Sequence, residues 1–175
     1  TLVEQILSAH EQVYGGGELR DIGRLLSDVP GLLNTKTPYP NCLVELTQQI
    51  VIQLADRYHA GLRELSTGAI RITDKMPQNF IHIGFICLML PKARIIHCKR
   101  NRWDTSLSIF FQNFSSAHSY SFDLENIAIY YERYLQMMSH WRKVADIPFL
   151  EVQYEELVDD QETVSRRMIE FLGLE

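Results

Sequence analysis

The sequence has little cysteine: Cys42, Cys87 and Cys98 are the three among 175 residues. The number is odd, no two of them have C-x-x-C spacing, and two fall in strongly apolar runs. A disulfide framework needs paired cysteines in an oxidising compartment, whereas buried free thiols are typical of reducing compartments. The pattern therefore favours free thiols and predicts a cytoplasmic location.

The sequence also lacks the patterns of a metal site, a membrane span and a nucleic-acid surface. Its six histidines show neither H-x-x-x-H nor H-E-x-x-H spacing. No apolar run is long enough to cross a membrane, and no signal peptide is visible. The net charge of −5 argues against general DNA or RNA binding, although a few placed arginines and lysines would suffice for a small anion. We therefore expect no metal, no membrane span in this segment and no nucleic-acid partner.

What is present is the pattern of an α/β domain. A hydrophobic content of 46% and a length of 175 residues suit one soluble domain over residues 1–175. Strands that alternate with helices predict βαβ units and a mostly parallel sheet flanked by helices. The strands are expected at 69–73, 93–98 and 149–152, and the longer helices at 43–65, 79–90, 103–114, 122–144 and 163–172.

The N-terminal part has a weaker pattern. Residues 1–10 have helical spacing, and the glycines that follow Tyr14 are expected to break this helix. Residues 22–26 are a short helical candidate, and the prolines within 29–41 predict a loop.

Polar clusters follow two of the predicted strands, where ligands of open parallel sheets bind. Lys99-Arg100-Asn101 follows one strand, and Ser108 lies on the helix that comes next. A guanidinium fork and a hydroxyl beside the unpaired N–H groups of a helix start suit a phosphate monoester. The alternative is an arginine paired with a surface carboxylate and a solvated serine. We favour the anion site for Arg100 and Ser108.

Lys75, Glu18 and Tyr154 each allow two interpretations. Lys75 could stabilise charge on a transferring or leaving oxygen, or form a salt bridge with Asp74 or another acid, and the residues alone favour neither. Glu18 follows three glycines and could act as a base, but a helix-start carboxylate is the simpler interpretation. Tyr154 could contact a ligand or cover the sheet edge.

Several other residues are expected to be structural. His97 and Cys98 lie within a predicted strand and are assigned to the core. Packing is also the simpler role for the aromatic residues of the helix that follows, namely Trp103, Phe110, Phe111 and Phe114.

Four ordered segments, taken together, resemble the sulfotransferase superfamily. T-L-V-E-Q-I-L-S-A-H-E-Q-V-Y-G-G-G-E-L (residues 1–19) resembles the helix and loop after the P-R-S-G-T-T phosphosulfate loop. T-D-K-M-P-Q-N (73–79) resembles a second motif, and I-I-H-C-K-R-N-R-W-D-T-S-L-S-I (95–109) resembles the strand–helix unit that binds a 3′-phosphate. V-Q-Y-E-E-L-V (152–158) is a weaker match in the right order. The resemblance runs essentially end to end, and is closest to bacterial domains found behind tetratricopeptide repeats and to tyrosylprotein sulfotransferases.

The resemblance implies a fold and a sulfonate donor. The fold is the P-loop-like three-layer arrangement of a parallel sheet between helices, and the donor is 3′-phosphoadenosine 5′-phosphosulfate (PAPS), which becomes PAP. Arg100 and Ser108 match the residues that hold the 3′-phosphate, and Tyr154 matches a nucleotide-side tyrosine. Thr1 matches the last threonine of P-R-S-G-T-T and would also bind the donor.

On the reacting side, Glu18 matches the catalytic base of the tyrosylprotein branch, which reverses the simpler interpretation given above. Lys75 matches the lysine that steadies the bridging oxygen as the sulfonate leaves. Arg20 falls where that branch contacts its acceptor. The acceptor itself stays open among peptide tyrosine, carbohydrate, lipid and small alcohols or amines, because acceptor pockets are built from variable loops.

The chain departs from the family pattern at both ends. The first central strand, most of the phosphosulfate loop and a C-terminal closing segment have no counterpart, so we expect a partial domain of a longer protein. Such a fragment is not assumed to bind PAPS or to be active alone, and tetratricopeptide repeats could precede it. Asn101-Arg102 stands where relatives often have Asp-Pro or Asp-Gly.

Two other functional classes are compatible with this fold class. A P-loop nucleotide kinase would require G-x-x-x-x-G-K-[ST], which the sequence does not contain. The second class is a non-catalytic module, a degenerate transferase that holds only PAP or a partner. The joint presence of four residues argues against such decay: Glu18, Lys75, Arg100 and Ser108.

Overall fold

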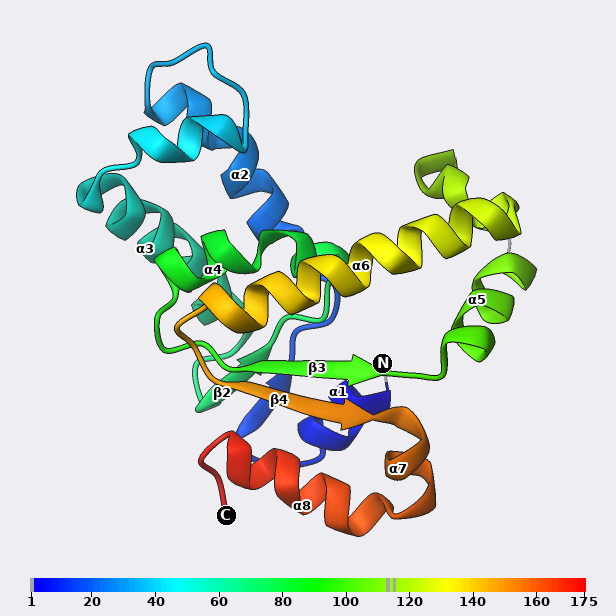
Figure 1. Cartoon of the computed structure of the whole chain (residues 1–175). Helices are drawn as coiled ribbons and strands as arrows, with labels where there is room; N and C mark the ends of the chain where they lie inside the picture. Colours follow the sequence, from blue (N-terminus) through cyan, green and yellow to red (C-terminus); the bar gives the residue numbers. More distant parts are fainter. Residues whose placement is uncertain (1, 113, 115) are drawn as a thin grey trace. The chain divides into compact units, whose positions relative to one another are not determined.

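The computed structural model describes residues 2–112, 114 and 116–175, so the predicted donor contact of Thr1 lies outside the described residues. The chain divides into two compact units, Thr1–Ala93 with Leu174 and Arg94–Gly173 with Glu175. Every strand pair of the described residues is parallel and accompanied by helices, which confirms the predicted α/β class (Figure 1).

The first unit contains two short strands and a helical core. Strands β1 and β2 pair in parallel, with Val13 opposite Arg71 and Gly15 opposite Thr73. Helices α2, α3 and α4 enclose the core, in which Val29, Leu54 and Phe85 are buried. The elements are α1 (Leu2–Ser8), β1 (Val13–Gly15), α2 (Asp21–Leu32), η1 (Asn41–Glu45), α3 (Gln48–Leu65), β2 (Arg71–Thr73), η2 (Pro77–His82) and α4 (Ile83–Met89).

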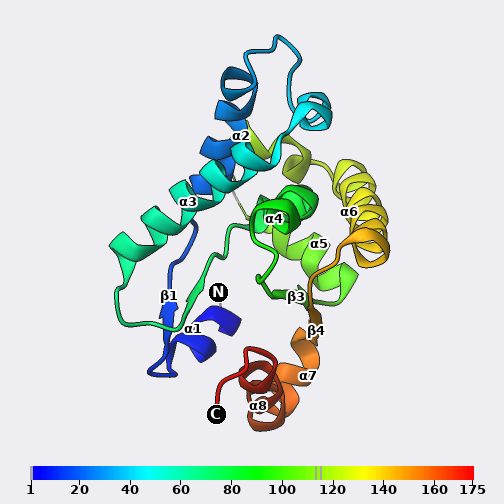
Figure 2. The same cartoon turned by 90° about the vertical axis from the view of Figure 1, so that its left-hand side faces the viewer.

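The second unit places a parallel strand pair between helices. Strands β3 and β4 run side by side, from Ile95 opposite Phe149 to Lys99 opposite Gln153. Helix α6 lies on one side of this pair and α7 and α8 lie on the other, in both views (Figures 1 and 2). The elements are β3 (Ile95–Lys99), α5 (Arg102–Phe111), η3 (Ser116–Phe122), α6 (Leu124–Val144), β4 (Phe149–Gln153), α7 (Tyr154–Asp159) and α8 (Gln161–Phe171).

Several details of the predicted elements are wrong, and three of them concern residues 13–65. Strand β1 begins at Val13, where no strand was predicted, and the pattern did not reveal it because it is three residues long and contains a glycine. The predicted loop at 29–41 begins later, since α2 continues through Pro30 to Leu32 and buries Val29 completely. The predicted helix 43–65 is a 3₁₀ turn followed by α3, which begins after Thr47, whose hydroxyl accepts from the N–H of Ile50 at 3.3 Å.

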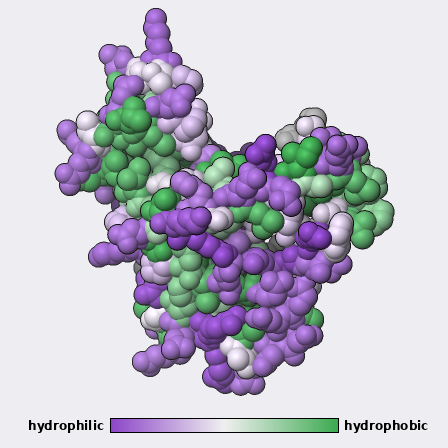
Figure 3. Space-filling model, viewed as in Figure 1, coloured by the Kyte–Doolittle hydropathy of each residue, from purple (hydrophilic) through white to green (hydrophobic). Residues whose placement is uncertain are grey.

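Exposure also differs from the prediction at several side chains. Cys98 is exposed, so it does not belong to the core, whereas Cys42 is fully buried. Trp103 and Phe111 are 65% and 78% exposed, so neither is a packing residue of this unit. Other large apolar side chains of this region are exposed as well, namely Leu107 and Phe110 on α5, Phe114, and Phe122 at the end of η3. Green side chains gather over these elements at the right of Figure 3.

His97 is buried, as predicted, and lies among polar side chains of the second unit. Its Nε2 contacts the Tyr134 hydroxyl on α6, and its Nδ1 lies 3.1 Å from Glu151 Oε1 on β4. Arg142 and Lys99 both pair with the same Glu151 carboxylate. Burial and these two nearby cations lower the pKa of His97 to about 4.

The depressed pKa of His97 predicts a pH-dependent stability. The unfolded chain binds a proton at His97 near pH 6.5, whereas the folded chain does so only near pH 4, so stability falls as the pH falls through this window. The loss is on the order of 3 kcal/mol. Urea unfolding at pH 7 and pH 4.5 should show a smaller pH effect in His97→Gln than in the wild type. The exposed His59, changed to Gln, serves as the control, and equal pH effects in both variants would contradict the assignment.

Gly16 predicts a second stability effect. A Cβ at this position would lie 2.3 Å from the carbonyl oxygen of Thr73, a backbone atom that cannot move without disturbing β2. Gly16→Ala should therefore lower the free energy of unfolding by about 1–3 kcal/mol. Gly23→Ala is the matched control, because a Cβ there meets nothing within 4 Å and the residue lies in α2, where alanine is favoured by about 0.5–1 kcal/mol. Chemical denaturation of both variants checks the opposite signs.

Candidate functional site

Glu18 and Lys75 meet at the carboxyl edge of the β1–β2 pair. Glu18 follows β1 through the glycine loop Gly15–Gly17, and Lys75 follows β2 by two residues. Because the strands are parallel, both polar residues come to the same edge. Lys75 Nζ lies 2.6 Å from Glu18 Oε1, and the Lys75 N–H donates to the Gly17 carbonyl at 2.8 Å.

Lys75 favours the ionised form of Glu18. The hydrogen bond from the ammonium group, and then its charge, lower the pKa of the Glu18 carboxyl group below its ordinary value. Glu18 is 56% exposed, so solvent screens this effect. The carboxylate is therefore ionised at neutral pH and is able to accept a proton.

The sequence allowed a salt bridge between Asp74 and Lys75, but Asp74 has a different role. Its Oδ2 accepts from the Tyr58 hydroxyl at 2.9 Å, and its Oδ1 accepts from the Met76 N–H at 3.2 Å. Burial raises the pKa of Asp74 and also that of Tyr58. Asp74 thus fixes the turn after β2 to helix α3, and the acid that pairs with Lys75 is Glu18.

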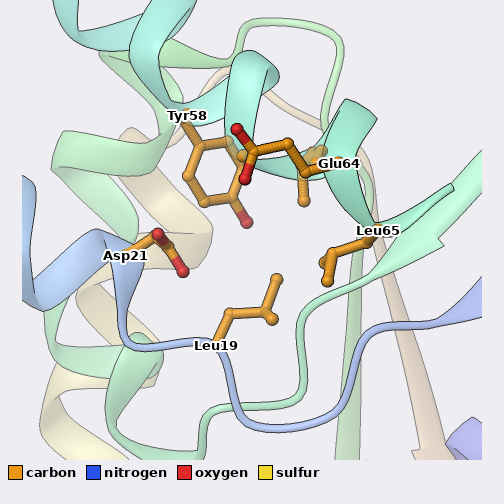
Figure 4. Close-up of a pocket in the computed structure, with 7 residues that line it drawn as sticks. Leu19, Asp21, Tyr58, Glu64 and Leu65 are labelled. Carbon is orange, nitrogen blue, oxygen red and sulfur yellow. The ribbon is translucent and has the colours of Figure 1, made fainter.

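A pocket of about 160 Å³ is lined in part by Leu19, the residue that follows Glu18. The side chains of Leu19 and Leu65 form apolar parts of its wall, and those of Asp21, Tyr58 and Glu64 supply oxygen atoms (Figure 4). The sequence patterns gave no sign of this pocket, because its walls come from the start of α2 and the last turns of α3. Arg20, the expected acceptor contact, is exposed at the start of α2.

In the second unit, Arg100 and Tyr154 follow β3 and β4 and lie together. The strands are in register up to Lys99 and Gln153, so the next residues leave the same edge. The Arg100 guanidinium carbon lies 5.1 Å from the centroid of the Tyr154 ring, within the range of a cation–π contact. Ser108 is exposed on α5.

Asn101 caps the helix that follows β3, a role that the sequence patterns did not predict. Its side-chain oxygen accepts from the N–H groups of Trp103 and Asp104 at 2.9 and 3.4 Å, and so caps α5. The predicted unpaired N–H groups at this helix start are thus occupied in part, which leaves the anion site to side chains. An asparagine one residue before a helical run was the signal that could have shown this.

Glu155 joins the ends of the two strands. Its Oε1 accepts from the Asn101 N–H at 2.8 Å, and its other oxygen accepts from the Gln153 side chain. The hydrogen bond from the Asn101 N–H, with smaller contributions that include the charge of Arg100, lowers the pKa of Glu155. The carboxylate is ionised and fixes the backbone from which Arg100 projects.

No group of three or more potential metal-ligating side chains was found among residues 2–112, 114 and 116–175. Within the same residues, no helix combines the length and the apolar character that a membrane crossing requires.

Comparisons with known proteins agree with the motifs in the sequence. A family model described as "Sulfotransferase family" matches residues 1–175. An "Uncharacterized protein" of Aquifex aeolicus (strain VF5) is 34% identical to the chain over 181 residues. The match covers 99% of this chain and 24% of that protein, so the chain spans about a quarter of the length of this relative.

Proposed function

Because the chain belongs to the sulfotransferase family, we propose that it transfers a sulfonate group from PAPS to a hydroxyl or amine acceptor. One observation carries this proposal: an ionised carboxylate, Glu18, lies 2.6 Å from an ammonium group, Lys75, at the carboxyl edge of a parallel strand pair. Sulfonate transfer to an alcohol needs a base for the acceptor proton and a cation for the leaving oxygen. This pair supplies both.

The proposed step begins when Glu18 takes the proton of the acceptor hydroxyl or amine. The acceptor oxygen or nitrogen forms a bond to the sulfur atom, while the bond between sulfur and the bridging oxygen of PAPS breaks. The electron pair of that bond remains on the phosphate oxygen of PAP, where Lys75 stabilises the new charge. The ammonium group has three donors, so Lys75 can contact Glu18 and the donor at the same time.

The residues of the second unit are proposed to hold the 3′-phosphate of the donor. Arg100 offers a planar fork of N–H donors that matches phosphate oxygens, and Ser108 offers a hydroxyl on the next helix. The contact with Tyr154 limits the positions open to the Arg100 guanidinium. Thr1 is proposed to contribute to the 5′ side of the donor, on the basis of the family motif.

The acceptor is proposed to approach from the pocket beside Leu19. Leu19, which lines this pocket, follows Glu18 directly in the chain, and Arg20 is the next residue. Protein tyrosine and carbohydrate hydroxyls are the two acceptor classes to test first.

Glu18→Gln tests the base in the full-length protein that carries this chain. Glutamine keeps the shape but cannot take the proton, so turnover should fall about a hundredfold or more, while PAP affinity changes by less than about twofold. Sulfonate transfer from labelled PAPS and calorimetry with PAP measure the two quantities. Glu11→Gln, an exposed carboxylate in the same part of the chain, is the control.

Three outcomes would contradict the proposal. Retained transfer in Glu18→Gln would remove Glu18 from the role. PAP binding without transfer to either acceptor class would identify a non-catalytic binding module, and Mg²⁺-dependent ATP turnover would identify a phosphotransferase.

Arg100→Ala tests the phosphate site. The loss of charge-assisted hydrogen bonds to a phosphate should raise the Kd for PAP about 10- to 100-fold. Arg102→Ala is the matched control, because Arg102 is an exposed neighbour whose guanidinium lies over the Trp103 ring at 4.6 Å. Equal affinities for PAP in the Arg100→Ala variant and the wild type would place the 3′-phosphate elsewhere.

A further inference from the structure

Glu4, on α1, contacts both chain segments that carry the Glu18–Lys75 pair. Its Oε1 accepts from the Gly17 N–H at 2.9 Å and from the Thr73 hydroxyl at 2.8 Å. Gly17 immediately precedes Glu18, and Thr73 ends the strand that leads to Lys75. One partly buried carboxylate therefore joins the two segments.

Both backbone polar groups of Gly17 form hydrogen bonds. Glu4 accepts from its N–H, and the Lys75 N–H donates to its carbonyl oxygen at 2.8 Å. Gly17 has a φ of +72°, a left-handed conformation that glycine adopts without a steric penalty. A residue as free as glycine needs outside contacts to hold one conformation, and these two hydrogen bonds set the direction in which the chain enters Glu18.

Thr73 extends the contact of Glu4 to Gly16. The Thr73 hydroxyl donates to Glu4 and accepts from the Gly16 N–H at 3.3 Å, and that N–H also bonds the Thr73 carbonyl at 3.1 Å. The side chain of Glu4 also lies beside Gly15, since its Cγ would be 3.7 Å from a Cβ at that position. Each glycine of the loop thus lies against Glu4 or against the threonine that Glu4 binds.

From these contacts we infer that Glu4 is a positioning residue, which aligns the carboxylate of Glu18 with the ammonium group of Lys75 through the glycine loop. The inference rests on the proposed function only for the chemical role of the pair. The contacts that hold the pair in place do not depend on that function. Glu4 acts through the Gly17 peptide and through Thr73, and it takes no proton in the proposed step.

Glu4→Ala and Glu4→Gln separate alignment from charge. Alanine removes the acceptor for both hydrogen bonds, so kcat should fall about 10- to 100-fold, with KM within about threefold of the wild type. Glutamine has a carbonyl oxygen in the same place, although a neutral one. Glu4→Gln should therefore recover most of kcat, and Glu11→Ala, at an exposed carboxylate beyond α1, should leave kcat unchanged.

The pH profile gives a readout that a general loss of folded protein would not move. The hydrogen bond from Lys75 keeps the pKa of Glu18 low, so a misaligned pair should let this pKa rise. The acidic limb of the kcat profile should then shift to higher pH in Glu4→Ala and stay in place in Glu11→Ala. An unshifted limb together with wild-type kcat in Glu4→Ala would overturn the inference.

Amide hydrogen exchange tests the same inference without activity. The Gly17 amide should exchange faster in Glu4→Ala than in Glu4→Gln or Glu11→Ala, because its acceptor is gone. If the wild type transfers no sulfonate, the proposed function fails while the exchange rates still decide the role of Glu4. If Glu4→Ala does not fold, Thr73→Val is the second variant, because it removes one of the two donors to Glu4. It should show the same changes to a smaller degree. Unchanged exchange rates of the Gly16 and Gly17 amides in Thr73→Val would overturn the inference.

Discussion

The close approach of Gly16 to the end of β2 is the constraint on which the geometry of the first unit depends. The Gly16 N–H bonds the Thr73 carbonyl at 3.1 Å, and the space that a Cβ would need is already filled by that carbonyl oxygen. A three-residue strand pair has few ladder hydrogen bonds of its own. Without the glycine, β1 could not continue alongside β2 far enough for Glu18 to come within hydrogen-bond distance of Lys75.

The chemistry of the pair follows from its exposure. A buried ion pair would be costly to desolvate, and its partners could hardly be shared with a substrate. Glu18 is more than half exposed and Lys75 is 29% exposed, so the contact is a weak one that leaves two ammonium donors for another anion. The surrounding loop is instead stabilised by hydrogen bonds of its backbone. Its N–H groups donate to Glu4 and Thr73, and one of its carbonyl groups accepts from the Lys75 N–H.

The second unit reaches a similar arrangement by other means. Five residue pairs connect β3 and β4, and side chains that follow the two strands continue the connection beyond the sheet. Glu155 accepts from the Asn101 N–H after the strands end, and Arg100 lies over the Tyr154 ring. Within the strands, the Glu151 carboxylate draws His97, Lys99 and Arg142 together and ties α6 to the pair. Both units therefore present polar side chains at the carboxyl edge of parallel strands.

Local pattern and residue order were enough to predict the α/β class, three of the four strands in the described residues, and the polar residues at the strand ends. The family was predicted from the resemblance of four ordered motifs. Apolar periodicity and strand-end position are properties of short segments, so they can be read without a structure. The partner of Lys75 could not be predicted in this way, because Glu18 and Lys75 are 57 positions apart. The sequence suggested only Asp74 or another acid. Strand β1, the cap formed by Asn101 and the double contact of Glu4 were decided by tertiary structure, since each depends on which backbone groups the fold leaves within hydrogen-bond distance.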